Sequence, residues 1–412
     1  TPNLPMVERQ AAKSHYVESD NDSLSLEKAI SMALELNPDL VAGGSEIKAQ
    51  EGRTLQQSLL PNPEFEVEFE NFSGSGPFKG MTATETTIAF GQSIELGGKR
   101  SKRTNVAALE GDLVDWRFEM KRLEVITNVR LLFTEILAAR KKQSLNQELL
   151  HISERFRINI DKLVQAGRLS PAELSRANVE LAKRQIILQQ NQRAQYVTKR
   201  KLAATWGADT FQFKTLQGEL EADLRLPSVE NLLRFLENNP QIIEQQIVIK
   251  RQKAGEELAG SESIPEPKIR VGYRRFNESD DQALIAGVSV PIPLFNRNQG
   301  GRQEAKFRVR QSVQRLLVIK SHIKNELINR HEILSGILDE IQTIKSIIIP
   351  EAQIAYTIIE QNYRQGKYAL IDVLDAQRQL FDAQSRYVDS LFHFHTKIIE
   401  IERVLGRTLE TL

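Results

Sequence analysis

Apolar and acidic residues alternate strictly in one short stretch of this chain, NPEFEVEFENF at residues 62–72. Phe65, Val67 and Phe69 occupy one set of alternate positions, and glutamates occupy the other. Alternation with a period of two is typical of a β-strand that has one apolar and one polar face. Most of the chain differs, because apolar residues recur at steps of three or four, as across residues 120–136. The patterns therefore predict a mainly α-helical protein with a small β part.

The two halves of the chain repeat these patterns in the same order. SLEKAISMALELNPDL returns as SVENLLRFLENNPQI, LLPNPEFEVEF returns as SIPEPKIRVGY, and LVQAGRLSPAEL returns as NYRQGKYALIDVL. A repeat of about 200 residues is too long for a solenoid unit, so the sequence predicts an internal tandem repeat.

Each repeat is predicted to contain a short helix, a second helix, a β-hairpin, a very long helix and a return helix. Strands are expected at about 64–72, 84–96, 268–276 and 283–294, and the long helices at about 100–165 and 301–364. The predicted segments are an N-terminal extended arm at 1–23, a first repeat at 24–207, a linker at 208–226, a second repeat at 227–406 and a C-terminal tail at 407–412.

Composition and motifs argue against several other classes of protein. Lys plus Arg number 55 and Asp plus Glu 54, so no net positive field favours nucleic acid. The chain has no Cys, GQSIELGGKR lacks the spacing of a phosphate loop, and the histidines of HFH at 393–395 diverge on a helix. We therefore predict no enzyme activity, no cofactor, no metal site and no nucleic-acid partner. The first residues, TPNLPMVERQ, lack a basic start and an apolar core, so we expect that any export signal has been removed.

The paired strands have the length and alternation of transmembrane β-strands, which run to about 9–11 residues. For any single strand, the alternative is a half-exposed sheet packed on a helix. Here, however, matched strands occur in both repeats, and the helices joined to them have no globular core for a sheet to cover. These two features favour transmembrane strands. Because an open sheet would leave backbone groups unsatisfied in lipid, several chains must share one closed barrel. Three chains with four strands each would supply twelve.

The duplicated order of elements, together with RQGKYALIDVLDAQRQL at 364–380, resembles the outer-membrane factors of Gram-negative tripartite efflux systems, the TolC-like channels. This resemblance covers the chain from about Leu24 to Gly406. It implies a homotrimer in the outer membrane, with a shared twelve-stranded transmembrane β-barrel and a long α-helical barrel that extends into the periplasm. The implied partners are outer-membrane lipid, a periplasmic adaptor (membrane fusion) protein and an inner-membrane pump of the resistance-nodulation-division (RND) class.

Three stretches resemble the heavy-metal branch of this family, the CzcC-like and CnrC-like proteins: NPEFEVEFENF, ETTIAFGQSIELGGKR and VPIPLFNRNQG. The branch implies a passive exit duct for divalent cations such as cobalt, zinc, cadmium or nickel. Two alternatives stay open: a multidrug or protein export channel of the same fold, and a soluble coiled-coil scaffold.

The resemblance also assigns roles to individual residues. In the barrel, one face of the strands would contact lipid and the other would line the lumen, and both signs of charge in the lumen would favour an unselective conduit. The expected lipid-facing residues are Phe65, Val67, Phe69, Ile269, Val271 and Tyr273, and the expected lumen residues are Glu64, Glu66, Glu68, Lys268, Arg270 and Arg274.

The glycine-centred turns would form periplasmic tips that dock the adaptor. Asp372 and Asp375, three residues apart on one helical face, match acidic positions of the closed aperture and would form its gate. The alternative is a pair of ordinary helix caps followed by solvated charge. The expected docking residues are Gly167, Arg168, Leu169, Gly366, Lys367 and Tyr368.

Overall fold

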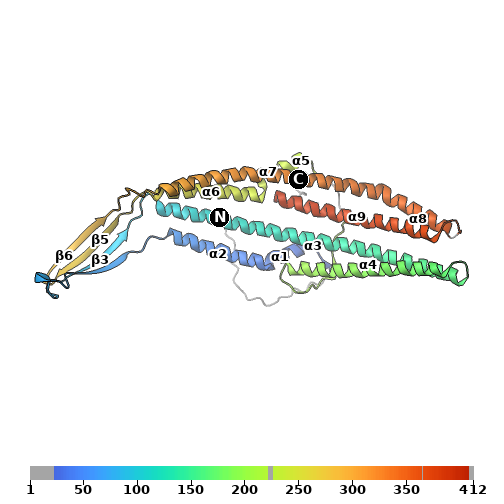
Figure 1. Cartoon of the computed structure of the whole chain (residues 1–412), viewed down its shortest axis with the longest axis horizontal. Coiled ribbons are helices and arrows are strands. Elements are labelled where there is room, and N and C mark those ends of the chain that lie inside the picture. The colour runs from blue at the N-terminus through green and yellow to red at the C-terminus, as the bar shows by residue number, and fades with distance from the viewer. Residues whose placement is uncertain (1–22, 221–225, 364, 408–412) are drawn as a thin grey trace. The chain divides into compact units, whose positions relative to one another are not determined.

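The structure, a computed structural model (Figure 1), describes residues 23–220, 226–363 and 365–407. These residues divide between two compact units. The first unit contains β1 (Ser23–Leu24), α1 (Leu26–Leu36), α4 (Pro171–Ala204), β4 (Thr215–Leu216) and α8 (Ile349–Tyr363). The second contains α2 (Pro38–Ser58), β2 (Glu64–Glu70), β3 (Glu85–Ser93), α5 (Val229–Leu233), α6 (Pro240–Ser261), β5 (Lys268–Phe276) and β6 (Asp281–Ser289). Helices α3 (Lys99–Gln165), α7 (Gln299–Thr343) and α9 (Leu370–Leu405) contribute residues to both.

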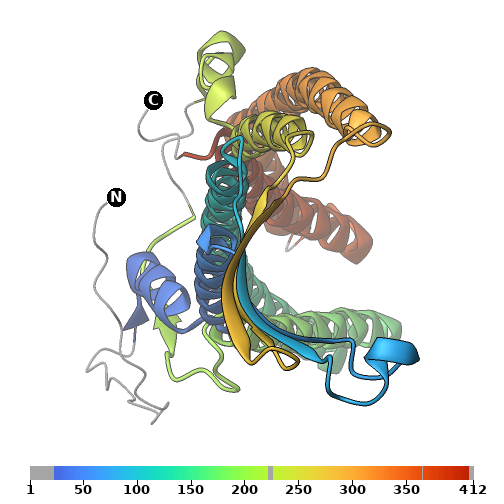
Figure 2. The ribbon, with the colours of Figure 1, turned by 90° about the vertical axis from the view of Figure 1, so that its left-hand side faces the viewer.

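The second unit contains a four-stranded antiparallel sheet in the order β2-β3-β5-β6. The hairpin of the first repeat, β2 and β3, thus lies beside the hairpin of the second, β5 and β6. Figure 2 shows that the sheet is strongly curved. Within the described residues, β2 and β6 each pair on one side only, so both edges of the sheet present unpaired backbone groups.

The last strand is shifted from its predicted position at 283–294. Strand β6 starts at Asp281, before the predicted start at 283, and it pairs only as far as Ser289. Pro291 and Pro293 follow, and neither has the N–H group that continued pairing would require. Strand β3 likewise ends at Ser93, before the predicted end at 96.

A double-glycine turn connects the sheet to the long helix α3. Gly97 and Gly98 have φ angles of 71° and 70°, which side chains other than glycine adopt with strain. A Cβ on Gly97 would lie 2.3 Å from Cδ1 of Ile264. Arg103, in the first turns of α3, donates to Glu95 at 2.6 Å, and this hydrogen bond raises the pKa of Arg103. The turn and the ion pair together fix the direction in which the chain passes from β3 into α3.

The second long helix is interrupted, which corrects the prediction of one helix over 301–364. Helix α7 ends at Thr343, a π-helical turn spans Ile344–Ile348, and α8 follows. Pro350 explains the interruption, because a proline has no N–H to donate to the preceding turn. The first repeat has no proline at the matching place, and α3 runs unbroken.

The Asn-Pro pair of each repeat performs the same structural task. Asn37 donates from Nδ2 to the carbonyl oxygen of Thr205 at 2.7 Å, and Asn239 donates to that of Val404 at 2.6 Å. Each bond ties the start of a repeat to the end of its last helix. The helix before the second pair differs from the prediction, because α5 is short and a 3₁₀ turn, Leu236–Asn238, follows it.

The start of the first repeat and the predicted linker meet in a short parallel pair. Strand β1 pairs with β4, which lies in the predicted linker at 208–226. Residues 1–22 of the predicted arm, 221–225 of the linker and 408–412 of the tail lie outside the described residues. No helix in the described part of the chain combines the length and the hydropathy that a membrane span requires.

Replacing Asn239 by Ala should lower the free energy of unfolding by about 2 kcal/mol. The substitution removes an N-cap acceptor for Gln241 N and Ile242 N, and it leaves the buried carbonyl of Val404 without its donor. Denaturant unfolding of the purified protein would measure the loss. The exposed neighbour Asn238 serves as the control, and an equal loss in Asn238→Ala would contradict the role assigned to Asn239.

Candidate functional site

One face of the sheet is a continuous apolar surface that is exposed in the isolated chain. In register, Phe65 lies opposite Phe90, which lies opposite Val271. The neighbouring row joins residues 67, 88, 273 and 284. The exposed apolar side chains of the four strands are Phe65, Val67, Phe69, Ile88, Phe90, Ile269, Val271, Tyr273, Leu284 and Val288. At about 3.3 Å per residue, a nine-residue strand spans roughly 30 Å, close to the ~25 Å apolar band of membrane barrels.

The opposite face of the sheet carries a ladder of ion pairs. Its anions are glutamates of β2 and β3, its cations belong to β5, and most pairs reach across β3, which lies between. The pairs and their N–O distances are Lys268–Glu64 at 2.5 Å, Arg270–Glu66 at 3.4 Å, Arg270–Glu68 at 3.1 Å, Arg274–Glu70 at 2.8 Å and Arg274–Glu85 at 2.9 Å. We call these eight side chains the charge ladder.

Small side chains on β3 make the charge ladder possible. On this face β3 carries Thr87, Ala89 and Gly91, and both Thr87 and Ala89 are fully buried. A Cβ on Gly91 would lie 2.8 Å from Cε of Lys268, and one on Gly272 would lie 2.7 Å from Cβ of Ala89. A larger residue at either glycine would occupy the path that the long side chains follow.

The predicted strand residues lie on the two faces of the sheet to which their alternation assigns them. The six expected lipid-facing residues share the apolar face, and the six expected lumen residues share the polar one. Sequence reasoning placed Glu70 on the same face as the other glutamates, but it missed the contributions of Glu85 and of the small residues of β3. The alternation of TTIAFGQ, in which Thr87, Ala89 and Gly91 take every second place, was the available signal.

The predicted tip residues lie at two turns of the first unit, where α3 meets α4 and α8 meets α9 (Figure 1). Both turns have the same geometry. Arg168 N donates to Leu163 O at 2.8 Å, and Lys367 N donates to Asn362 O at 3.0 Å. Gly167 and Gly366 have φ angles of 68° and 74°. These are the features of a Schellman helix end.

The four helices pack on one another directly behind these turns. Ile160 of α3, Ala177 of α4 and Leu370 of α9 form a buried cluster, and Tyr363 of α8 packs against it. Leu169 also joins this cluster, whereas Gly167, Arg168, Gly366, Lys367 and Tyr368 are exposed. The exposed turn residues therefore form a surface, while Leu169 holds the turn in place.

The two predicted gate residues have partners within their own helix. Asp372 accepts a hydrogen bond from Ala369 N at 2.8 Å, which is half of a capping box at the start of α9. Asp375 pairs with Arg378 and accepts from Gln379 at 2.8 Å. Both carboxylates are half-buried. In the first repeat Ser170 caps α4 instead, by accepting from Ala172 N at 3.2 Å.

Two buried polar atoms near the turns lack hydrogen-bond partners, the hydroxyl oxygen of Tyr363 and Oε2 of Glu173. Burial raises the pKa of the Tyr363 hydroxyl, and the negative charge of Glu173 raises it further. Tyr363 therefore stays neutral at physiological pH and can act only as a neutral hydroxyl.

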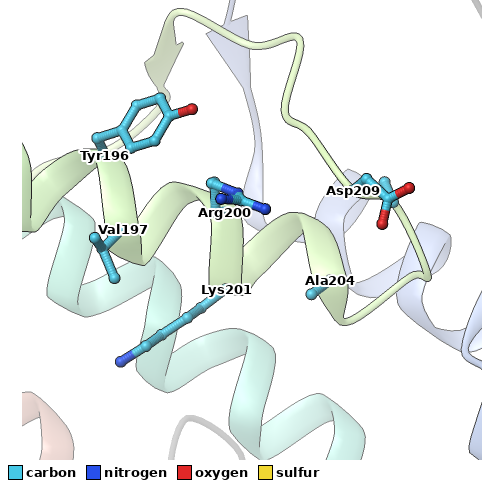
Figure 3. Close-up of a pocket in the computed structure, with 7 residues that line it drawn as sticks. Tyr196, Val197, Arg200, Lys201, Ala204 and Asp209 are labelled. Atoms are coloured by element: carbon cyan, nitrogen blue, oxygen red, sulfur yellow. The ribbon is translucent and has the colours of Figure 1, made fainter.

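The remaining candidate sites show no arrangement typical of catalysis or metal binding among the described residues. Figure 3 shows a shallow hollow on α4 with a volume of about 340 Å³, lined by Tyr196, Val197, Arg200, Lys201, Ala204, Ala208 and Asp209. No hydrogen bond or ion pair between its lining side chains is observed among the described residues, so the hollow shows no preorganised catalytic grouping. No group of three or more His, Cys, Asp or Glu side chains among the described residues has the geometry of a metal site.

The HFH stretch has a structural role in the described chain. Nε2 of His395 lies 2.6 Å from the carbonyl oxygen of Leu220, and burial lowers the pKa of His395. A neutral imidazole that donates this hydrogen bond fits both observations.

Comparison with known proteins identifies relatives of the whole chain. Residues 29–208 and 232–407 match the family described as outer membrane efflux protein. The cobalt-zinc-cadmium resistance protein CzcC of Cupriavidus metallidurans is 30% identical over 99% of this chain and 94% of its own length. The nickel-cobalt-cadmium resistance protein NccC of Alcaligenes xylosoxydans xylosoxydans is 23% identical over 72% of this chain and 66% of its own.

A solved structure has the same fold. The outer membrane protein VceC of Vibrio cholerae superposes with a TM-score of 0.77 at 18% identity, and the match covers 93% of this chain and 96% of VceC. This likeness confirms the predicted fold class, in which long helices predominate over a small β part.

Replacing Gly366 by Ala should destabilise the protein by about 1 kcal/mol, because alanine at a positive φ is strained although its Cβ would meet no atom. The matched control is Gly336, which lies inside α7 with equally open space around its Cβ position. Gly336→Ala should stabilise by up to about 1 kcal/mol. Thermal unfolding midpoints would compare the two, and a shift of the same sign in both would refute the role of the turn.

Proposed function

Because the chain belongs to the family of outer membrane efflux proteins, we propose that it is the exit duct for divalent heavy-metal cations of the cobalt, zinc, cadmium or nickel class. The protein is an outer-membrane efflux channel and not an enzyme. Members of the family are trimeric channels of tripartite efflux systems. The observation that supports the duct is the sheet, whose two faces suit lipid and water, whereas the cargo rests on the relatives.

The two open edges of the sheet support a trimer with a shared barrel. In lipid, the unpaired N–H and C=O groups of β2 and β6 would each cost several kcal/mol. Pairing β6 of one chain with β2 of the next satisfies both edges. Three chains then close a barrel of twelve strands, well above the smallest closed barrels, which have about eight.

The faces of the sheet determine its orientation in this barrel. The apolar face meets lipid, since ten exposed apolar side chains would be costly in water. The charge ladder then lines the lumen. Ions of both signs there suit a wide passage, so the choice of cargo belongs to the pump.

The tips serve to dock the partners. The exposed residues of the two turns, Arg168, Lys367 and Tyr368 among them, are the surface for a periplasmic adaptor that works with an RND pump. Asp372 and Asp375 form a ring of carboxylates at the closed aperture of the trimer. Their bonds to Ala369 N and Arg378 hold these carboxylates in defined positions, which favours a rigid ring.

The cargo is inferred from the relatives, since CzcC and NccC are resistance proteins for cobalt, zinc, cadmium and nickel. A multidrug or protein export channel of the same fold is the alternative. A soluble coiled-coil scaffold does not fit, because the family resides in the outer membrane.

Cysteine labelling in membranes tests the orientation, and the chain has no native Cys to interfere. Glu66 and Val67 are adjacent, exposed in the isolated chain and on opposite faces of β2. We expect Glu66→Cys to react with a membrane-impermeant thiol reagent at least about tenfold faster than Val67→Cys, because only a thiolate in water is reactive. Similar rates in membranes would refute the proposed faces, and similar rates in the denatured protein are the control.

Growth of a strain that lacks the gene tests the cargo. We expect the strain to become hypersensitive to one or a few of cobalt, zinc, cadmium and nickel, and the intact gene to restore tolerance. Drugs and detergents, tested in parallel, are the control. Sensitivity to these compounds with unchanged metal tolerance would favour the general export channel.

A further inference from the structure

The charge ladder is nearly balanced within a single chain. Five carboxylates face three cations, so the ladder keeps a net charge of only minus two. Each arginine serves two carboxylates: Arg270 pairs with Glu66 and Glu68, and Arg274 with Glu70 and Glu85. The glutamates of β2 are thus occupied by cations of the same molecule.

Free glutamates in this arrangement would hold a divalent cation. Glu64, Glu66, Glu68 and Glu70 follow one another at every second position on one strand face, about 6.6 Å apart. Carboxylate oxygens are ligands for divalent metals, and a row of uncompensated carboxylates also raises the local concentration of cations. A conduit must release each ion as readily as it admits it, so such a row would retain the cargo.

The cations occupy positions from which they block this binding. Arg270 and Arg274 reach the glutamates only because β3 presents Gly91, Ala89 and Thr87 beneath them. Thr87 adds a contact, since its Oγ1 accepts a hydrogen bond from Nε of Arg274 at 2.9 Å. The guanidinium groups are therefore fixed over the middle of the sheet and do not extend freely into solvent.

We propose that Arg270 and Arg274 set the electrostatic potential of the lumen, acting as counter-ions that keep the β2 glutamates from binding cations in transit. Both arginines lower the affinity of the lumen for cations and do not select among cargoes. The inference rests on the proposed orientation of the sheet in the barrel. Beyond that orientation, we infer that the lumen attracts cations only weakly, and that Arg270 and Arg274 set the strength of this attraction.

A single cysteine can report the potential from inside the barrel. Gly287 of β6 lies opposite Arg270 in register, on the polar face, and a Cβ there would meet no atom within 4 Å. Gly287→Cys in membranes would be treated with a cationic and with an anionic methanethiosulfonate. The ratio of the two rates measures the local potential, because changes in thiol reactivity cancel. The ratio is independent of whether the tips are open, since the reagents enter from the extracellular side.

Adding Arg270→Gln to this reporter should raise the cationic-to-anionic ratio at least about threefold at ~10 mM salt, and the rise should shrink at ~1 M salt. The double substitution Glu66→Gln with Glu68→Gln should lower the ratio. Arg274→Gln removes the other proposed counter-ion, so it should also raise the ratio, and it tests the inference should Arg270→Gln fail to assemble.

The matched control is Arg275→Gln, on the same strand but the opposite face, where Arg275 pairs with Asp280 at 2.7 Å. It should leave the ratio unchanged. An unchanged ratio in Arg270→Gln, or an equal shift in Arg275→Gln, would overturn the inference and leave the orientation standing. If Gly287→Cys reacts with neither reagent while Ala286→Cys reacts with both, the orientation itself is wrong, and the inference falls with it.

Discussion

The pairing of β3 with β5 is the interaction on which the sheet and its chemistry depend. It is the only place in the described chain where a strand of one repeat pairs with a strand of the other within the four-stranded sheet. It aligns the apolar rows of four strands into one surface and places the cations of β5 within reach of the glutamates of β2. Gly272 permits this approach, since a Cβ there would meet the backbone oxygen of Ile88 at 2.6 Å. In the proposed trimer, each chain contributes this unit to the shared barrel.

Much of this arrangement could be predicted from the sequence, because strand faces follow from a period of two and need no tertiary information. The separation of Phe65, Val67 and Phe69 from the glutamates is of this kind. The ion pairs could not be predicted in the same way. Arg270 and Glu66 belong to strands that are not neighbours, so their contact depends on the strand order and on the small size of Ala89 between them. The period-two pattern of a single strand reveals neither the order of the strands nor which residue lies between the two charges.

The same distinction holds for the helices and the turns. Gly167 and Gly366 allowed both turns to be predicted, because a turn that needs a positive φ favours glycine, which is visible in the sequence. Pro350 was equally visible, yet its effect was not, since a proline in a long helix can produce a kink, an end or the π-helical turn found here. Asp372 shows a further limit. Its capping bond to Ala369 N is local, whereas a role in a ring of three depends on copies of the chain that one sequence does not describe.

The charge ladder constrains how the two repeats can diverge. Glu64 and Lys268 are 204 positions apart and belong to different repeats, yet they form one ion pair. A duplicated segment is ordinarily free to change once its twin retains the original task. Here a change of sign on β2 would leave an unmatched charge on β5, so the charge of one repeat is matched by residues of the other. The two repeats thus supply the two halves of one electrostatic unit.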